Sequence, residues 1–260
     1  MIARFITALA LGMTSVSVQA SPAADTDFLI PRMSVGEHIS NVYSIAASVK
    51  AEGFDERVGR NSGSADYTLT KTSPDGTLTF EMDDRYDGAA GTHAVDIIRD
   101  GGAVSCYNGS KCAIYTDASG AVYNRLLWGD PPAKLMPGMT WTVTIPQPWE
   151  LGPAGRQVVT VVHLDDTDGT VTLKREGRAV GLLAKEPAQV TLTKGGKPIT
   201  LDVTPGQAHW SGYTTFRHGV VISDELLVMR TDELRSKETG PVRATRRRYI
   251  LLNAAPYPTL

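Results

Sequence analysis

The sequence lacks the short motifs that mark the common enzyme classes. It contains no Gly-x-Ser-x-Gly nucleophile elbow, no Ser-x-x-Lys, no His-Glu-x-x-His and no phosphate-binding loop. It has only five histidines, and they are too far apart in the chain to suggest a set of zinc ligands. We therefore predict no catalytic residues, no metal site and no cofactor, and we favour a role other than catalysis.

A strong charge of either sign is also absent. The 26 Lys and Arg residues and the 28 Asp and Glu residues give a formal net charge of −2 at pH 7. Nucleic-acid-binding proteins generally carry a strongly basic face, so this balance argues against nucleic acid as a partner. The sequence does not indicate an oligomeric state.

The apolar run near the N-terminus is too short to cross a bilayer, which takes roughly 20 residues. The run Phe5–Met13 follows Arg4 and precedes small residues that end at Ala20. This order is typical of a secretory signal peptide. We predict a signal peptide over 1–20, a flexible leader over 21–33, and a secreted, periplasmic protein without a membrane span. An uncleaved anchor is the alternative.

Most of the remaining chain alternates short apolar, β-branched runs with Pro, Gly and Asp turn signals. Thr140–Ile145 and Arg156–Leu164 are the clearest pair of strands, and Val122–Leu127 is another expected strand. The pattern predicts a mainly β fold. We expect an antiparallel meander of about a dozen strands, arranged as a barrel, a half-barrel or a sandwich. Residues 34–260 are expected to form a single β-rich domain, and a subdivision near 129–135 is the alternative.

One helix is expected before the strands, packed on the sheet. Ser34 and Glu37 have the spacing of a capping box. Apolar residues then recur at the spacing of one helical face, at Val35, Ile39, Val42, Ala46 and Val49. A strand through Val42–Val49 is the competing interpretation, because Val, Tyr and Ile are good strand formers.

The two cysteines, Cys106 and Cys112, flank the turn dipeptide Asn108-Gly109. In an oxidising compartment, thiols joined by so tight a turn are expected to pair. We predict a disulfide between them, and closing so short a loop contributes about 2 kcal/mol.

Arginines crowd the last expected strand. Residues two apart share one face of a strand, so Arg246 and Arg248 are expected on the face that carries Ile250 and Leu252. Guanidinium groups beside apolar side chains suit the carboxylate or phosphate head of a small ligand. Protection of a sheet edge by charge is the alternative, and it is the more common reason for such residues.

The preceding hairpin supplies three further candidate ligand contacts, Trp210, Tyr213 and His218. For the aromatic residues, packing in the core is the alternative. Together with the arginines they favour a non-enzymatic protein that binds an apolar or anionic small ligand, or a cell-envelope accessory protein. One other hypothesis is a hydrolase with a dispersed site that includes His163 and Asp165. The other is an interaction module of an envelope assembly, which would show an exposed apolar patch.

Overall fold

The described part of the chain is almost entirely antiparallel β-sheet. The computed structural model describes residues 28–86, 89–97, 103–107, 111–115, 122–149, 151–184 and 186–255. Its elements are, in chain order, β1 (His38–Ala51), β2 (Arg57–Thr72), β3 (Leu78–Tyr86), β4 (Ala89–Ile97), β5 (Ala103–Tyr107), β6 (Lys111–Tyr115), α1 (Arg125–Trp128), β7 (Thr140–Ile145), β8 (Gly155–Asp165), β9 (Thr170–Val180), β10 (Gln189–Lys194), β11 (Lys197–Thr204), β12 (Gln207–Arg217), β13 (Val220–Ser236) and β14 (Gly240–Ala255).

All fourteen of these strands belong to one sheet. Its main path runs β6-β5-β4-β3-β2-β1-β14-β13-β12-β9-β8-β7. The hairpin β10–β11 branches from this path, because β11 pairs with β13. Most neighbours on the path are also neighbours in the sequence. The exception that matters most is the antiparallel pair of β1 with β14, which places the first and last described strands in the middle of the sheet.

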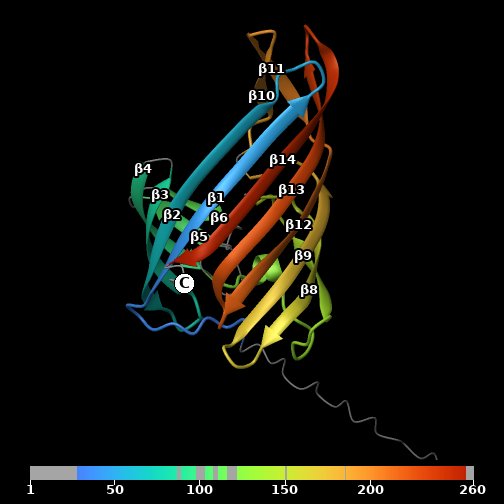
Figure 1. The fold of residues 1–260 in the computed structure, drawn as a ribbon. Helices are drawn as coiled ribbons and strands as arrows, with labels where there is room; N and C mark the ends of the chain where they lie inside the picture. Colours follow the sequence, from blue (N-terminus) through green and yellow to red (C-terminus); the bar gives the residue numbers. More distant parts are fainter. Residues whose placement is uncertain are drawn as a thin grey trace, which may run out of the picture.

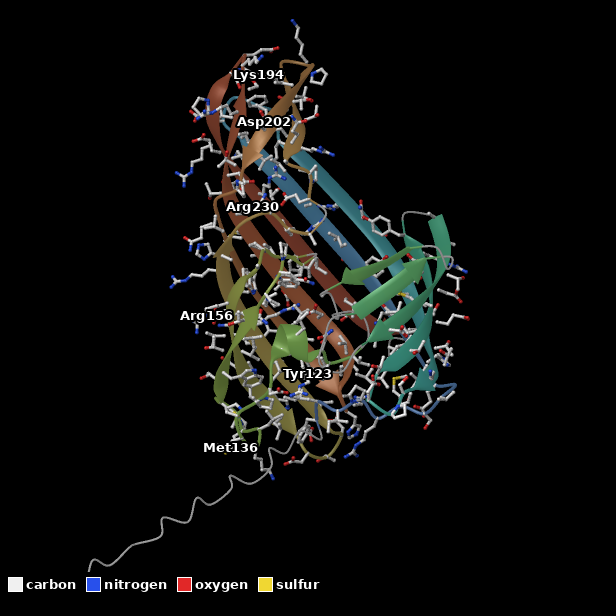
Figure 2. The ribbon with its side chains drawn as sticks, turned by 180° about the vertical axis from the view of Figure 1, so that it is seen from behind. Tyr123, Met136, Arg156, Lys194, Asp202 and Arg230 are labelled. Atoms are coloured by element: carbon white, nitrogen blue, oxygen red, sulfur yellow. The ribbon has the colours of Figure 1, made fainter. Side chains whose placement is uncertain are left out.

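The sheet is strongly curved. In Figure 1, β2, β1, β14 and β13 lie side by side, while β3 to β6 curl back at one side and β9 and β8 at the other. The view from behind in Figure 2 looks into the concave side, where α1 lies. Among the described strands, the path ends on β6 and β7, which do not pair, so the sheet is an open half-barrel. The predicted mainly β, antiparallel fold is confirmed.

Alternating burial explains why these segments are strands. In β12, Ala208, Trp210 and Phe216 are buried, while Gln207 and His209 are exposed. Side chains of a strand alternate between its two faces, so this pattern packs one face on an apolar interior and leaves the other in water. The clearest pair predicted from the sequence is found as β7 and β8, paired along the whole of β7.

The predicted N-terminal helix is wrong, because residues 38–51 form β1. The Ser34–Glu37 contact does form: the Ser34 N–H donates to Glu37 Oε2 at 2.8 Å, and the Glu37 N–H donates to Ser34 O at 3.0 Å. It closes a turn at Gly36, whose φ of +93° suits glycine. β1 then pairs with β2 on one side and β14 on the other. Pairing with two neighbouring strands stabilises β1 more than the helical spacing of its apolar residues could stabilise a helix.

The expected strand over Val122–Leu127 is also wrong. Val122 makes only an isolated bridge to Val220, and the next residues form α1. Asn124 explains the helix start, because its Oδ1 accepts a hydrogen bond of 2.8 Å from the Leu126 N–H, as an N-cap does. Trp128 at the other end of α1 is fully buried in the largest apolar core.

That core joins both halves of the chain. It contains Trp128 of α1, Leu135, Trp141 of β7 and Trp210 of β12. Residues 129–135, where a subdivision was the alternative, therefore connect two parts of one core. The predicted signal peptide and the leader up to residue 27 lie outside the described residues. Phe28, near the end of the leader, belongs to the same core.

Candidate ligand-binding groove

A groove of about 970 Å³ runs along the concave side of the sheet. Its floor consists of residues from β2, β1, β14 and β13. Its opposite wall includes Leu183, Glu186 and Pro187, from the connection between β9 and β10. Pockets that hold small molecules have volumes of about 300–1,000 Å³, so the groove has room for a ligand of that class.

The floor of the groove changes from apolar to cationic along the strands. The β1–β14 register gives four successive rows of groove residues: Tyr43 with Leu252, Ile45 with Ile250, Ala47 with Arg248, and Val49 with Arg246. On the next strand, Arg230 of β13 extends the last row beside Arg246. At about 3.4 Å per residue, Leu252 and Arg246 lie roughly 20 Å apart along β14. The apolar end, which Asn41 and Asp84 border on its far side, is therefore separate from the cationic end.

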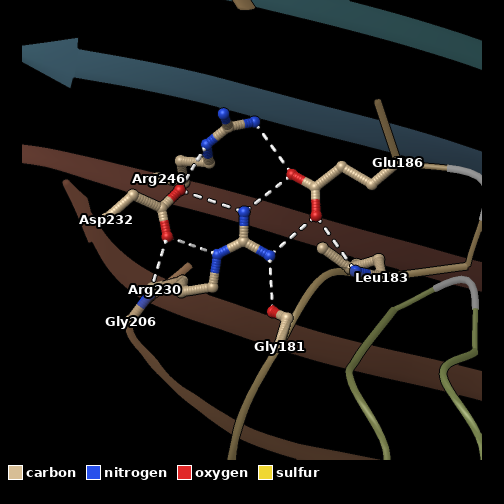
Figure 3. A network of polar contacts seen from close by, with 7 residues as sticks. All are labelled: Gly181, Leu183, Glu186, Gly206, Arg230, Asp232 and Arg246. Atoms are coloured by element: carbon tan, nitrogen blue, oxygen red, sulfur yellow. Dashed lines mark hydrogen bonds and ion pairs between the residues drawn. The ribbon is translucent and has the colours of Figure 1, made fainter. Parts of the chain in front are cut away.

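Arg230 organises an ion network at the cationic end (Figure 3). Its guanidinium donates to both carboxylate oxygens of Asp232, at 2.6 and 3.0 Å, and to both of Glu186, at 2.7 Å each. It also donates to the carbonyl of Gly181 at 2.9 Å. These contacts use all five N–H donors that an arginine has. Arg230 therefore has no donor left for a further partner.

Arg246 lies against the same two carboxylates but is not saturated. Its Nη1 donates to Glu186 Oε1 at 2.9 Å. Its Nε lies 2.6 Å from Asp232 Oδ2 but in poor hydrogen-bonding geometry. Its Nη2 is buried and makes no hydrogen bond within the described residues, and Figure 3 shows it directed away from both carboxylates. A buried unmet donor costs about 1–3 kcal/mol, so Arg246 can still gain from an acceptor.

The network is balanced in charge and mostly shielded from water. The side chains of Asp232, Arg230 and Glu186 are 0, 2 and 11% exposed. Burial by itself disfavours the charged form of Glu186. Hydrogen bonds from Arg230 and the Leu183 N–H, together with the charges of Arg230 and Arg246, outweigh it and lower the pKa of Glu186. Burial is likewise outweighed at Arg230, where Glu186 and Asp232 raise the pKa.

Glu186 also fixes the wall that carries it. We call residues 181–184 and 186–187 the strap. Besides its ion pairs, Glu186 accepts a hydrogen bond of 3.0 Å from the Leu183 N–H. The Ala184 N–H donates to the carbonyl of Trp149 at 2.9 Å. The described part of the strap contains no strand, so these contacts, the hydrogen bond from Arg230 to the Gly181 carbonyl and the packing of Leu182 on a neighbouring apolar cluster position it over the groove.

A second buried ion pair lies deeper in the core. Arg175 of β9 donates from Nη2 to both oxygens of Asp224 of β13, at 2.9 and 2.8 Å, and both side chains are at most 1% exposed. The Arg175 guanidinium lies 4.8 Å from the ring centre of Trp128 and 5.5 Å from that of Trp149. Neither residue lines the groove, so we assign the pair to structure.

The structure brings two of the five predicted ligand residues to the groove. Arg246 and Arg248 both line it. Trp210 is buried in the core, where its Nε1 donates to Gln157 Oε1 at 2.9 Å. Tyr213 is 44% exposed and does not line the groove. His218 lies in the turn between β12 and β13 with a φ of +46°, its imidazole against Gly169.

Sequence reasoning missed Arg230, Asp232 and Glu186. Glu186 lies 44 residues from Arg230 and 60 from Arg246 in the chain, so no local pattern links them. A usable signal was present at Arg230 and Asp232. Both lie on the buried face of β13, between the buried apolar residues Val228 and Leu234. A charged residue at such a position needs a partner.

The two residues named for the hydrolase hypothesis lie near the end of β8. His163 is exposed on β8, and Asp165 accepts a hydrogen bond from the Thr167 N–H in the turn that follows. Within the described residues, no group of three or more His, Cys, Asp or Glu side chains is placed to hold a metal ion.

Comparisons with known proteins add no family. No family model matches the chain, and no curated protein sequence matches it. Among the described residues, no helix combines the length and the apolar character that a membrane span requires.

Proposed function

We propose that this protein is a non-enzymatic binding protein for an amphipathic small molecule with an apolar body and an anionic head. The observation that carries the proposal is the separation of the groove into two ends. Tyr43, Ile45 and Leu252 offer apolar surface to the body of the ligand, and Arg246 and Arg248 offer guanidinium groups to its head. Apolar walls with a few convergent polar groups are the usual composition of a ligand site.

Binding measurements on the purified protein test the proposal. The probes are hexadecanoate, which has an anionic head, and hexadecanol, which has the same body without the charge. We expect hexadecanoate to bind more tightly. Arg248→Ala is expected to weaken hexadecanoate binding about tenfold, or roughly 1.4 kcal/mol, with little effect on hexadecanol. Arg243→Ala, an exposed arginine of the same strand outside the groove, is the matched control.

The proposal fails if neither probe binds, or if Arg248→Ala and Arg243→Ala affect both probes equally. Native mass spectrometry of the protein as purified is a second measurement. It is expected to detect a bound amphiphile that organic extraction removes.

We further propose that the protein is exported to the periplasm and carries a disulfide. The order of charge and apolar residues before Ala20 supports export. The β5–β6 register, which places Cys106 directly opposite Cys112, supports the disulfide. Cell fractionation and intact-mass measurement test both points. The expected product begins near Ser21, is found in the periplasm, and takes up two alkyl groups only after reduction.

A further inference from the structure

The cationic end of the groove is already occupied by a carboxylate of the protein itself. Glu186 reaches from the strap into the groove and accepts hydrogen bonds from Arg230 through both oxygens and from Arg246 through one. A planar carboxylate therefore matches this position in size, shape and charge. The groove leads from this position to Ile250 and Leu252, about 14 to 20 Å away along β14.

On the basis of the proposed function, we infer that the Glu186 carboxylate occupies the position of the ligand head and is displaced when the ligand binds. The ligand is then a carboxylic acid with an apolar tail. Its carboxylate replaces that of Glu186 on Arg230 and Arg246, and Arg248, two residues along the same face of β14, adds positive charge beside it. The strap moves away from the groove as the tail occupies the apolar end.

The distribution of hydrogen bonds supports this exchange. Asp232 neutralises one of the two positive charges of Arg230 and Arg246, and Glu186 neutralises the other. When Glu186 leaves, one positive charge of the two arginines is no longer neutralised. Because this charge lies beside an apolar groove, the site can then bind an anionic head that carries an apolar tail. Arg246 keeps an unused Nη2 donor even in the presence of Glu186. An incoming carboxylate, not tied to the strap, is free to satisfy it.

The strap is suited to release. Its two ends join β9 and β10, but its described part is not paired in the sheet. Loss of the Glu186 contacts removes the hydrogen bond from the Leu183 N–H together with the hydrogen bonds from both arginines. The hydrogen bonds of the Ala184 N–H with Trp149 and of Arg230 with the Gly181 carbonyl, and the packing of Leu182, then remain to hold its first half, while the segment around Glu186 loses all of the polar contacts of the Glu186 carboxylate.

Variants that lack the Glu186 carboxylate test the inference. We expect Glu186→Gln to raise the affinity for hexadecanoate about tenfold, because the neutral amide no longer competes for the guanidinium groups. Glu186→Ala, which vacates the position, is expected to have at least the same effect. Affinity for hexadecanol should stay within about twofold of the wild type. Glu176→Gln, an exposed glutamate on β9 whose partner is Lys174, is the matched control.

Hydrogen exchange on the wild-type protein gives a readout that does not depend on a variant. Hexadecanoate is expected to speed exchange at the N–H groups of Leu183 and Glu186, which are bonded within the strap. Unchanged or slower exchange there, or a Glu186→Gln variant with unchanged or lower affinity for hexadecanoate, overturns the inference while leaving the binding function in place. Absence of binding in every variant overturns the proposed function itself.

Discussion

Arg175 and Asp224 form a two-point ion pair in the interior, with one guanidinium nitrogen 2.8 and 2.9 Å from the two carboxylate oxygens. Thr214 also donates its hydroxyl hydrogen to Asp224. The pair connects β9 with β13 across the intervening β12, and two tryptophan rings lie against the guanidinium. Its members depend on each other, because neither charge is accessible to water.

The first prediction concerns that pair. Asp224→Ala leaves the Arg175 charge buried and uncompensated, so we expect a loss of about 3–5 kcal/mol in the free energy of unfolding. Denaturation in urea measures it. The double variant Arg175→Met with Asp224→Leu is expected to recover most of the loss, since it removes both charges. A single variant as stable as the exposed control Asp166→Ala would contradict the assignment of a structural role.

The second prediction tests the packing of β9 on β12. Gly177 lies under the indole of Trp210, and a Cβ at this position would collide with the ring. The ring is not free to move, because its Nε1 is bonded to Gln157. We expect Gly177→Ala to reduce stability by about 1–3 kcal/mol. Gly59→Ala, where a Cβ meets no atom within 4 Å, is the control. Equal melting temperatures for the two variants would show that Trp210 is mobile.

The third prediction concerns pH. The pKa of Glu186 lies below its ordinary value of 4.5 in the folded protein, because Arg230, Leu183 and Arg246 together outweigh burial. A lowered carboxyl pKa stabilises the folded state above the unfolded pKa, and this contribution is lost as the pH falls through the folded pKa. Glu186→Gln is therefore expected to cost about 1–3 kcal/mol near pH 7. The difference from the wild type should shrink below about pH 4.5, as measured by urea denaturation across pH.

The fourth prediction concerns the space inside the groove. Ala47 stands between the apolar rows and Arg246 on the groove face of β1. We expect Ala47→Trp to fill the groove and reduce the affinity for both hexadecanoate and hexadecanol at least tenfold, which is about 1.4 kcal/mol. Ala46→Trp places the same side chain on the opposite face of β1 and serves as the control. Equal binding by the two variants would place the ligand elsewhere.

Local patterns in the sequence were sufficient to predict most of the strands. Alternation and turn residues identified β7 and β8 almost to the residue, because those signals are local. They failed at β1, where Ser34 and Glu37 form the hydrogen bonds of a capping box around a turn instead of a helix. What decides the structure there is pairing with both β2 and β14, and β14 lies about 200 residues away, beyond the reach of a local signal. The strand formers within Val42–Val49 were the local sign of β1.

Local patterns in the sequence likewise predict only part of the groove. The shared face of Arg246 and Arg248 follows from the period of a strand, and both side chains are in the groove. The carboxylates that Arg246 meets come from β13 and the strap, and only the tertiary structure unites them. Residue type and proximity in the sequence point to Trp210 and His218, but neither property determines where a side chain lies relative to a groove.

The pairing of β1 with β14 has a consequence for the order in which the protein folds. The floor of the groove requires residues near both ends of the described chain, so it cannot form before β14 is available to pair with β1 and β13. Such distant pairing is slow, because a long loop must close before its contacts stabilise the structure. The outer parts of the sheet, built from hairpins, can form earlier. We therefore expect the peripheral hairpins to become ordered before the groove exists.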